Sequence, residues 1–118
     1  MKLRLHSNTL RLRLSRSDVA RLAESGRVEE KIEFAPGQAL VYALETRPAA
    51  EVAASFDGMR IEVVVPAELA TVWMESGETG IERSGGPVKI LIEKDFVCAH
   101  GPKEENADAF PNPLMDKF

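Results

Sequence analysis

The side chains best suited to chemistry gather near the C-terminus, in a run that contains Cys98, His100 and Asp108. A thiolate and an imidazole two residues apart can ligate one transition metal, and a carboxylate can complete its coordination shell. Two further acids, Glu104 and Glu105, lie in the same run. The competing interpretation is a small buried apolar Cys98 with solvated acids. The composition favours it, because a structural zinc site uses four Cys or His ligands and the chain has one Cys and two His.

The same cysteine is a candidate nucleophile, with His100 or His6 as its base. Nucleophilic catalysis also needs an oxyanion hole and a third group that orients the base, and no spacing in the sequence identifies either. The leading hypothesis is therefore a non-enzymatic binding or interaction module without a cofactor. A small metal-assisted or Cys/His-dependent enzyme is the alternative.

A second candidate site is electrostatic. Residues 1–16 contain five Lys or Arg residues and no Asp or Glu. Arg4, Arg11 and Arg13 fall on the polar side of two alternating segments, and guanidinium groups bind phosphate or carboxylate oxygens in pairs. A further alternative is thus a protein that binds a small anion, such as a phosphorylated metabolite, through these three residues.

These cations also have a structural use. Cross-strand ion pairing is the commoner role of such a face, and the acids available are those of the C-terminal run together with Glu29, Glu30 and Glu33 on a neighbouring strand. Nucleic acid is not expected as a partner. The net charge of the chain is −4, and residues 1–16 contain no aromatic side chain on which a base could stack.

Hydrophobic periodicity in the first half predicts two strands, a helix and two more strands. Leucines alternate with polar residues through 3–5 and 10–14, which indicates half-buried strands joined by a tight turn. Ser15 and Asp18 have the spacing of a capping box, and Gly26 is typical of a helix end. The predicted helix carries an apolar stripe formed by Val19, Leu22 and Ala23. Residues 27–34 and 38–45 follow as strands.

The second half repeats this order. Residues 51–56 and 59–65 flank Asp57-Gly58, a strong hairpin signal. A helix is expected to begin at Pro66 and to close at Gly77, with a stripe of Leu69, Val72 and Trp73. Residues 79–83 and 88–96 complete the pattern as strands. Glu-Ser-Gly recurs at 24–26 and 75–77, an offset of 51 residues. We interpret it as two ends of helices in a duplicated ββαββ unit, residues 1–46 and 50–96.

These elements predict an α+β domain over residues 1–97. Its strands, about eight, are expected to form a mainly antiparallel sheet or an open barrel with two short helices. Two halves related by a pseudo-twofold axis are a further arrangement. Residues 98–118 are expected to form a C-terminal strap that packs on the domain or on a partner, with Phe110 as its main anchor.

Composition restricts the class of protein. The chain is 44% hydrophobic and 29% charged, which is typical of a globular domain. One cysteine excludes an intrachain disulfide. No signal peptide is expected, and no run approaches the roughly 18 apolar residues of a membrane span. We therefore expect a soluble cytoplasmic protein without a membrane partner, with self-association as a homo-oligomer as an open alternative.

Three segments carry a resemblance to a known family. The opening MKLRLHSNTLRLRLSRSDVARL, the phrase LIEKDFVC and the ending FPNP together resemble a family of small uncharacterised bacterial proteins, known only as a domain of unknown function. The resemblance spans about residues 1–113 and brings no activity, cofactor or catalytic residue with it.

Overall fold

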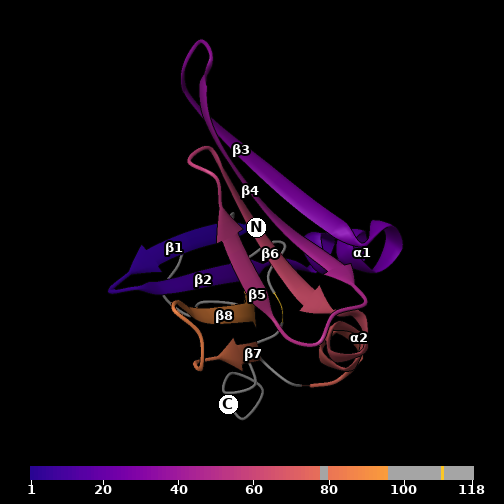
Figure 1. The fold of residues 1–118 in the computed structure, drawn as a ribbon. Helices are drawn as coiled ribbons and strands as arrows, with labels where there is room; N and C mark the ends of the chain where they lie inside the picture. Colours follow the sequence, from indigo (N-terminus) through magenta and orange to yellow (C-terminus); the bar gives the residue numbers. More distant parts are fainter. Residues whose placement is uncertain (78–79, 96–109, 111–118) are drawn as a thin grey trace, which may run out of the picture.

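The computed structural model describes residues 1–77, 80–95 and 110 of the chain (Figure 1). In this part of the chain it has eight strands and two helices. The strands are β1 (Lys2–His6), β2 (Thr9–Leu14), β3 (Arg27–Ala35), β4 (Gln38–Arg47), β5 (Ala53–Phe56), β6 (Arg60–Pro66), β7 (Gly80–Arg83) and β8 (Lys89–Lys94). The helices are α1 (Arg16–Ser25) and α2 (Ala67–Glu75). The predicted α+β class and the predicted order of elements are confirmed.

The strands divide into two four-stranded sheets. Sheet A has the order β1-β2-β8-β7, and sheet B has the order β3-β4-β6-β5. In each sheet the outer pairs are antiparallel and the central pair is parallel. Most pairings are therefore antiparallel, as predicted, and the described strands form two sheets instead of one, without a closed barrel. The reason is that each sheet combines one hairpin from each half of the chain.

The pairing fits a ββαββ unit used twice. The hairpin β1–β2 of the first half joins β7–β8 of the second, and β5–β6 of the second half joins β3–β4 of the first. Exchanging the two halves therefore converts sheet A into sheet B. The central registers fit this relation if the two halves are aligned with a gap of three residues. Leu10 lies opposite Ile90 in sheet A and Ile61 lies opposite Tyr42 in sheet B, and the offsets are 61 − 10 = 51 and 90 − 42 = 48 residues.

The core lies between the inner faces of the two sheets. In β2 and β8 every second residue is buried, as the alternating leucines of β2 predict. In β4 and β6 the buried residues include the consecutive runs 42–44 and 63–65. The buried cluster includes Leu12 and Ile92 of sheet A with Leu44 and Val63 of sheet B. Burial of these apolar rows, at roughly 25 cal/mol per Å² of apolar surface, is the main contribution that holds the sheets together.

Helix α1 begins with the predicted capping box. The Ser15 hydroxyl accepts a hydrogen bond from the backbone N–H of Asp18 at 3.2 Å, and the Asp18 carboxylate accepts one from the backbone N–H of Ser15 at 3.0 Å. Gly26 ends the helix in the left-handed region, with φ 77°. The buried face consists of Asp18 and Leu22, whereas Ala23, expected in the stripe, is exposed.

Helix α2 differs from the prediction in its ends and its buried face. It begins after Pro66, the last residue of β6, and ends at Glu75, with Ser76 in an extended conformation instead of a left-handed Gly77. Its buried residues are Ala70 and Trp73. Leu69 and Val72, expected in the buried stripe, are 40% and 54% exposed. Each precedes a buried residue by one position, about 100° around the helix axis.

A buried lysine occupies the end of the inner row of β8. Lys94 is 7% exposed and donates a hydrogen bond from Nζ to the carbonyl oxygen of Ser76 at 2.8 Å. Its Nζ lies 5.6 Å from the ring centroid of Trp73 and 5.7 Å from that of Phe110. The backbone N–H of Phe110 donates to the carbonyl oxygen of Asp95 at 2.8 Å. These contacts support Phe110 as an anchor, while residues 98–109 and 111–118 of the proposed strap lie outside the described residues.

Replacing Phe110 with alanine is expected to lower the free energy of unfolding by about 1–2 kcal/mol, because the variant loses a cation–π contact with the buried Lys94. Thermal or urea unfolding of the full chain measures the change. The control is Val72→Ala, which removes apolar side-chain atoms from a position on α2 that is 54% exposed. Equal melting of the two variants would show that Phe110 is not an anchor.

Candidate functional site

An apolar groove opens between the two sheets, beside the turn of the β1–β2 hairpin, with a volume of about 570 Å³. Its apolar lining consists of Leu5, Leu10 and Val88 on the side of sheet A and of Ala54, Phe56 and Ile61 on the side of sheet B. Among the described lining residues, His6 is the only ionisable one; the other polar ones are Ser7, Asn8, Thr9 and Ser55. The groove thus offers apolar contact with few polar anchors.

The exposure of this region follows from the unequal lengths of the strands. β3 and β4 have 9 and 10 residues, whereas β1 and β2 have 5 and 6. The β3–β4 hairpin therefore projects beyond the rest of the molecule (Figure 1). Along the inner row of β3, Val28 is buried but Ile32 is exposed, because sheet A no longer covers the strand. Phe34 lies in the bulge near the tip.

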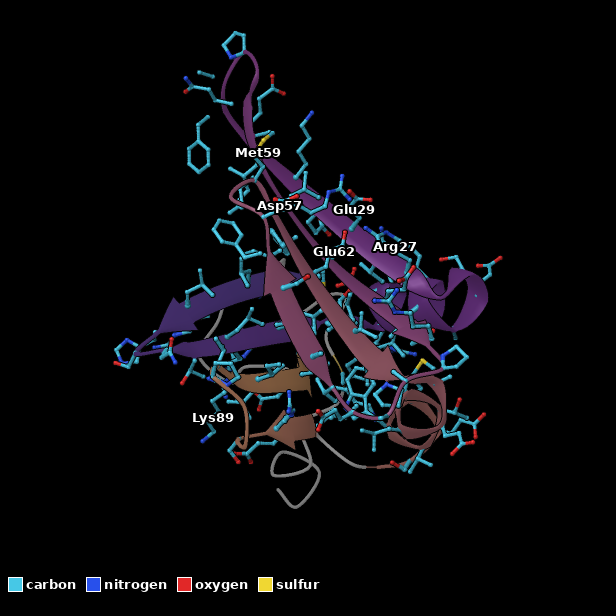
Figure 2. The ribbon with its side chains drawn as sticks, viewed as in Figure 1. Arg27, Glu29, Asp57, Met59, Glu62 and Lys89 are labelled. Carbon is cyan, nitrogen blue, oxygen red and sulfur yellow. The ribbon has the colours of Figure 1, made fainter. Side chains whose placement is uncertain are left out.

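Large exposed apolar side chains are concentrated at the groove and on the projecting hairpin. Their exposed fractions range from 44% to 72%, and the residues are Leu5, Ile32, Phe34, Phe56 and Met59. Figure 2 places Met59 beside the projecting hairpin. From the sequence, these residues were placed only in predicted strands. Their exposure could not be inferred from periodicity, which identifies a face but not what covers it.

The outer face of sheet B carries a balanced ionic network. Arg27 donates from both η nitrogens to the two carboxylate oxygens of Glu62 at 2.9 and 3.0 Å. This bond holds the pKa of the Glu62 carboxyl below its ordinary value. Arg60 lies 3.4 Å from Glu29 and 3.2 Å from Glu62. Arg27, Glu29 and Glu62 point toward one another in Figure 2. The network satisfies its own charges, so we interpret it as structural.

The outer face of sheet A holds the predicted anion-binding residues. Arg4 lies directly opposite Arg11 in the register of β1 and β2, and Arg13 lies opposite Lys2. Arg4 and Arg11 line a concavity of about 210 Å³, which we call the basic pocket, together with His6, Thr9 and Leu91. The structure therefore brings two of the three predicted arginines to one pocket and leaves Arg13 in the next row of the sheet.

The expected ion pairs of these cations are different from those observed. Glu29, Glu30 and Glu33 were predicted on a neighbouring strand, but all three belong to β3 of the other sheet. Arg11 instead pairs through Nε with Glu93 of β8. The physical reason is the parallel pairing of β2 with β8, a contact between distant segments that local periodicity does not reveal.

A buried ionic cluster lies at the start of α1. The side chain of Asp18 is 3% exposed, and its carboxylate lies 2.7 Å from the N-terminal ammonium of Met1 and 2.7 Å from an η nitrogen of Arg21. The same ammonium is 3.1 Å from Glu30. The Met1 carbonyl oxygen accepts a hydrogen bond from the Tyr42 hydroxyl at 2.9 Å. We interpret this cluster as structural, because its carboxylate already has several donors.

Comparison with known proteins identifies the family of this chain. Residues 1–114 match a family described as Family of unknown function (DUF7009). The chain belongs to this family. No curated protein and no solved structure matches the chain. Membership therefore extends over both sheets, the groove and the basic pocket, and it assigns no activity to any of them.

The family match also covers the predicted metal site. Cys98, His100 and Asp108 lie outside the described residues, so this site stays a prediction, as does a Cys98 nucleophile. Within residues 1–77, 80–95 and 110, no group of three or more His, Cys, Asp or Glu side chains is arranged to hold a metal ion. Neither described helix has the length and apolar character needed to cross a membrane.

Proposed function

We propose that this protein is a non-enzymatic interaction module that pairs with a second copy of itself through the apolar groove and the projecting β3–β4 hairpin. The proposal keeps the cytoplasmic location expected from the cysteine content. The observation that carries it is that five of the seven large exposed apolar side chains of the described residues lie at the groove, on the projecting hairpin or beside it; the other two, Leu69 and Val72, lie on α2. A folded domain seldom leaves such a patch exposed unless a partner covers it.

A second copy fits this surface because one molecule offers both complementary shapes. The hairpin presents Phe34, an aromatic ring that is 72% exposed, and the groove presents an apolar hollow of about 570 Å³ between Leu5 and Phe56. In a twofold dimer each contact occurs twice, since the same patch serves both subunits. Each Phe34 would then enter the groove of the other copy.

Charge does not oppose this contact. The chain carries a net charge of −4, which by itself disfavours self-association. Near the tip of the hairpin, however, Lys31 and Glu33 lie 4.0 Å apart and cancel, and the described lining of the groove contains no Lys, Arg, Asp or Glu. The apolar surfaces can therefore meet without bringing like charges together.

Sedimentation velocity over a range of protein concentrations tests the proposal. We expect a reversible dimer for the unaltered chain. Phe34→Asp and Phe56→Asp should each weaken it by about 100-fold or more, because an aromatic anchor in a dimer interface typically contributes at least about 2–3 kcal/mol. Both residues are exposed in the single chain, so melting of the dissociated variants should change little.

Leu69→Asp is the matched control, because Leu69 is an exposed apolar residue of α2 outside the groove. It should dimerise like the unaltered chain. A chain that stays monomeric at all concentrations would contradict the proposal, and so would a dimer that Leu69→Asp disrupts as strongly as Phe34→Asp does.

A further inference from the structure

The register of sheet A places like charges side by side on its outer face. Arg4 lies opposite Arg11, and Lys2 lies opposite Arg13. Directly opposed like charges destabilise a pair of strands unless counter-charges lie between them. Anionic groups on this face would therefore stabilise the arrangement.

The acids that the structure describes on this face compensate only part of the charge. Its cations are Lys2, Arg4, Arg11, Arg13 and Lys89. The ion pairs to them are Asp95 with Lys2 at 3.0 Å, Glu93 with Arg11, and Glu82 with Lys89 at 3.1 Å. Arg4 and Arg13 form no ion pair with a described residue. This imbalance contrasts with sheet B, where Arg27, Arg47 and Arg60 meet Glu29, Glu45 and Glu62.

Two of the excess cations, Arg4 and Arg11, line the basic pocket. Its volume of about 210 Å³ is bounded by Leu91 and by the side chains of Arg4, His6, Thr9 and Arg11. Glu93 contacts Arg11 through Nε. Within the described part of the chain no acceptor engages the η nitrogens of Arg11, so they remain available to a ligand. Glu93 thereby orients the guanidinium.

We infer that the basic pocket binds a phosphoryl group, with Arg4 and Arg11 as its principal ligands and the Thr9 hydroxyl and His6 imidazole as further hydrogen-bonding groups. A guanidinium donates two hydrogen bonds in a plane, which matches two oxygens of a phosphate. A tetrahedral phosphoryl group has enough oxygens for both arginines and a hydroxyl. The shared chemistry is that of inorganic phosphate and of a small phosphomonoester.

This inference does not rest on self-association, because its principal ligands Arg4 and Arg11 lie on the outer face of sheet A and outside the groove; His6 and Thr9 line both the groove and the basic pocket. Calorimetric titration at low ionic strength tests it with inorganic phosphate, glycerol phosphate and acetate. We expect phosphate or glycerol phosphate to bind with a dissociation constant of about 1 mM or lower, and acetate to bind more weakly. Tighter binding of glycerol phosphate than of phosphate identifies a phosphomonoester as the ligand, and equal binding identifies the free anion.

Arg4→Gln and Arg11→Gln should each weaken binding by about tenfold or more, since each removes charged hydrogen bonds to the ligand. The matched control is Arg47→Gln, which makes the same change of net charge on the outer face of sheet B, where Arg47 faces Glu45. It should leave binding within about twofold. If neither phosphate nor glycerol phosphate binds at about 10 mM, a concentration at which even a weak site would be occupied, the inference is overturned.

Two further outcomes overturn it. The first is an equal loss of binding in Arg47→Gln, which would show a net-charge effect without a site. The second concerns the C-terminal acids Glu104, Glu105 and Asp108. If the unaltered chain binds no phosphate but a full-length variant with these three acids changed to amides does, then the chain itself fills the pocket and no external ligand is needed.

Discussion

Replacing Asp18 with alanine is expected to lower the free energy of unfolding by about 3–5 kcal/mol, the usual effect of removing one partner of a buried ion pair. The side chain of Asp18 is 3% exposed and lies 2.7 Å from the ammonium of Met1. In the variant, the buried ammonium of Met1 keeps only its ion pair with Glu30, at 3.1 Å, among the described residues. It also removes the carboxylate from the capping box of α1. Urea unfolding measures the difference.

Glu24→Ala is the matched control for this prediction, because Glu24 is an exposed acid of the same helix. It should change the free energy of unfolding by less than about 0.5 kcal/mol. A comparable loss in both variants would mean that the effect comes from helix propensity or net charge and not from the buried cluster.

The same cluster predicts acid sensitivity. Burial by itself would raise the pKa of Asp18, but hydrogen bonds from the Met1 ammonium and from Ser15 hold the pKa below its ordinary value. Because the pKa is lower in the folded chain than in the unfolded chain, the ionised carboxylate stabilises the fold above about pH 4. This contribution is lost as the pH falls through the lower pKa of the folded state. Between about pH 6 and pH 3, Asp18→Ala should therefore lose less stability than the unaltered chain.

Replacing Trp73 with alanine is expected to lower the free energy of unfolding by about 3–5 kcal/mol, the range for deleting a large aromatic side chain from a core. Trp73 is 1% exposed and is among the largest fully buried side chains of the described residues. Its ring also lies 5.6 Å from the ammonium of Lys94. The variant leaves a cavity beneath α2 and removes one of the two rings beside a buried cation.

Val72→Ala is the control, since Val72 precedes Trp73 by one residue and is 54% exposed. We expect a change below about 1 kcal/mol. The pair of variants tests the orientation of α2 directly. A loss of several kcal/mol in Val72→Ala would show that Val72 is buried, as in the stripe expected from the sequence, and would contradict the face seen in the structure.

Local patterns were sufficient for the elements of this fold. The alternation of Leu10, Leu12 and Leu14 identified both a strand and its buried side, because side chains on a strand point alternately to opposite faces. The Ser15–Asp18 spacing predicted a capping box that the structure contains. The order of the elements, which fits a ββαββ unit used twice, also followed from sequence, since turn residues and periodicity recur in the second half.

The candidate sites were only partly predictable. Arg4, Arg11 and Arg13 were grouped by their spacing, and the structure brings Arg4 and Arg11 to one pocket because their strands form a hairpin with that register. No pattern in the amino-acid sequence predicted the apolar groove. Leu5 and Phe56 look like ordinary residues of strand interiors, and their exposure depends on where the other sheet ends.

The sequence by itself determined the order of helices and strands, the buried side of β2 and the start of α1, because these depend on neighbours a few residues away. Only the tertiary structure decided that β2 joins β8 and β4 joins β6, in two sheets with parallel centres. It likewise decided which face of α2 is buried and that β3 and β4 extend past sheet A. These features depend on contacts between the two halves of the chain. The hydrophobic pattern of one segment does not show which distant segment it will pack against.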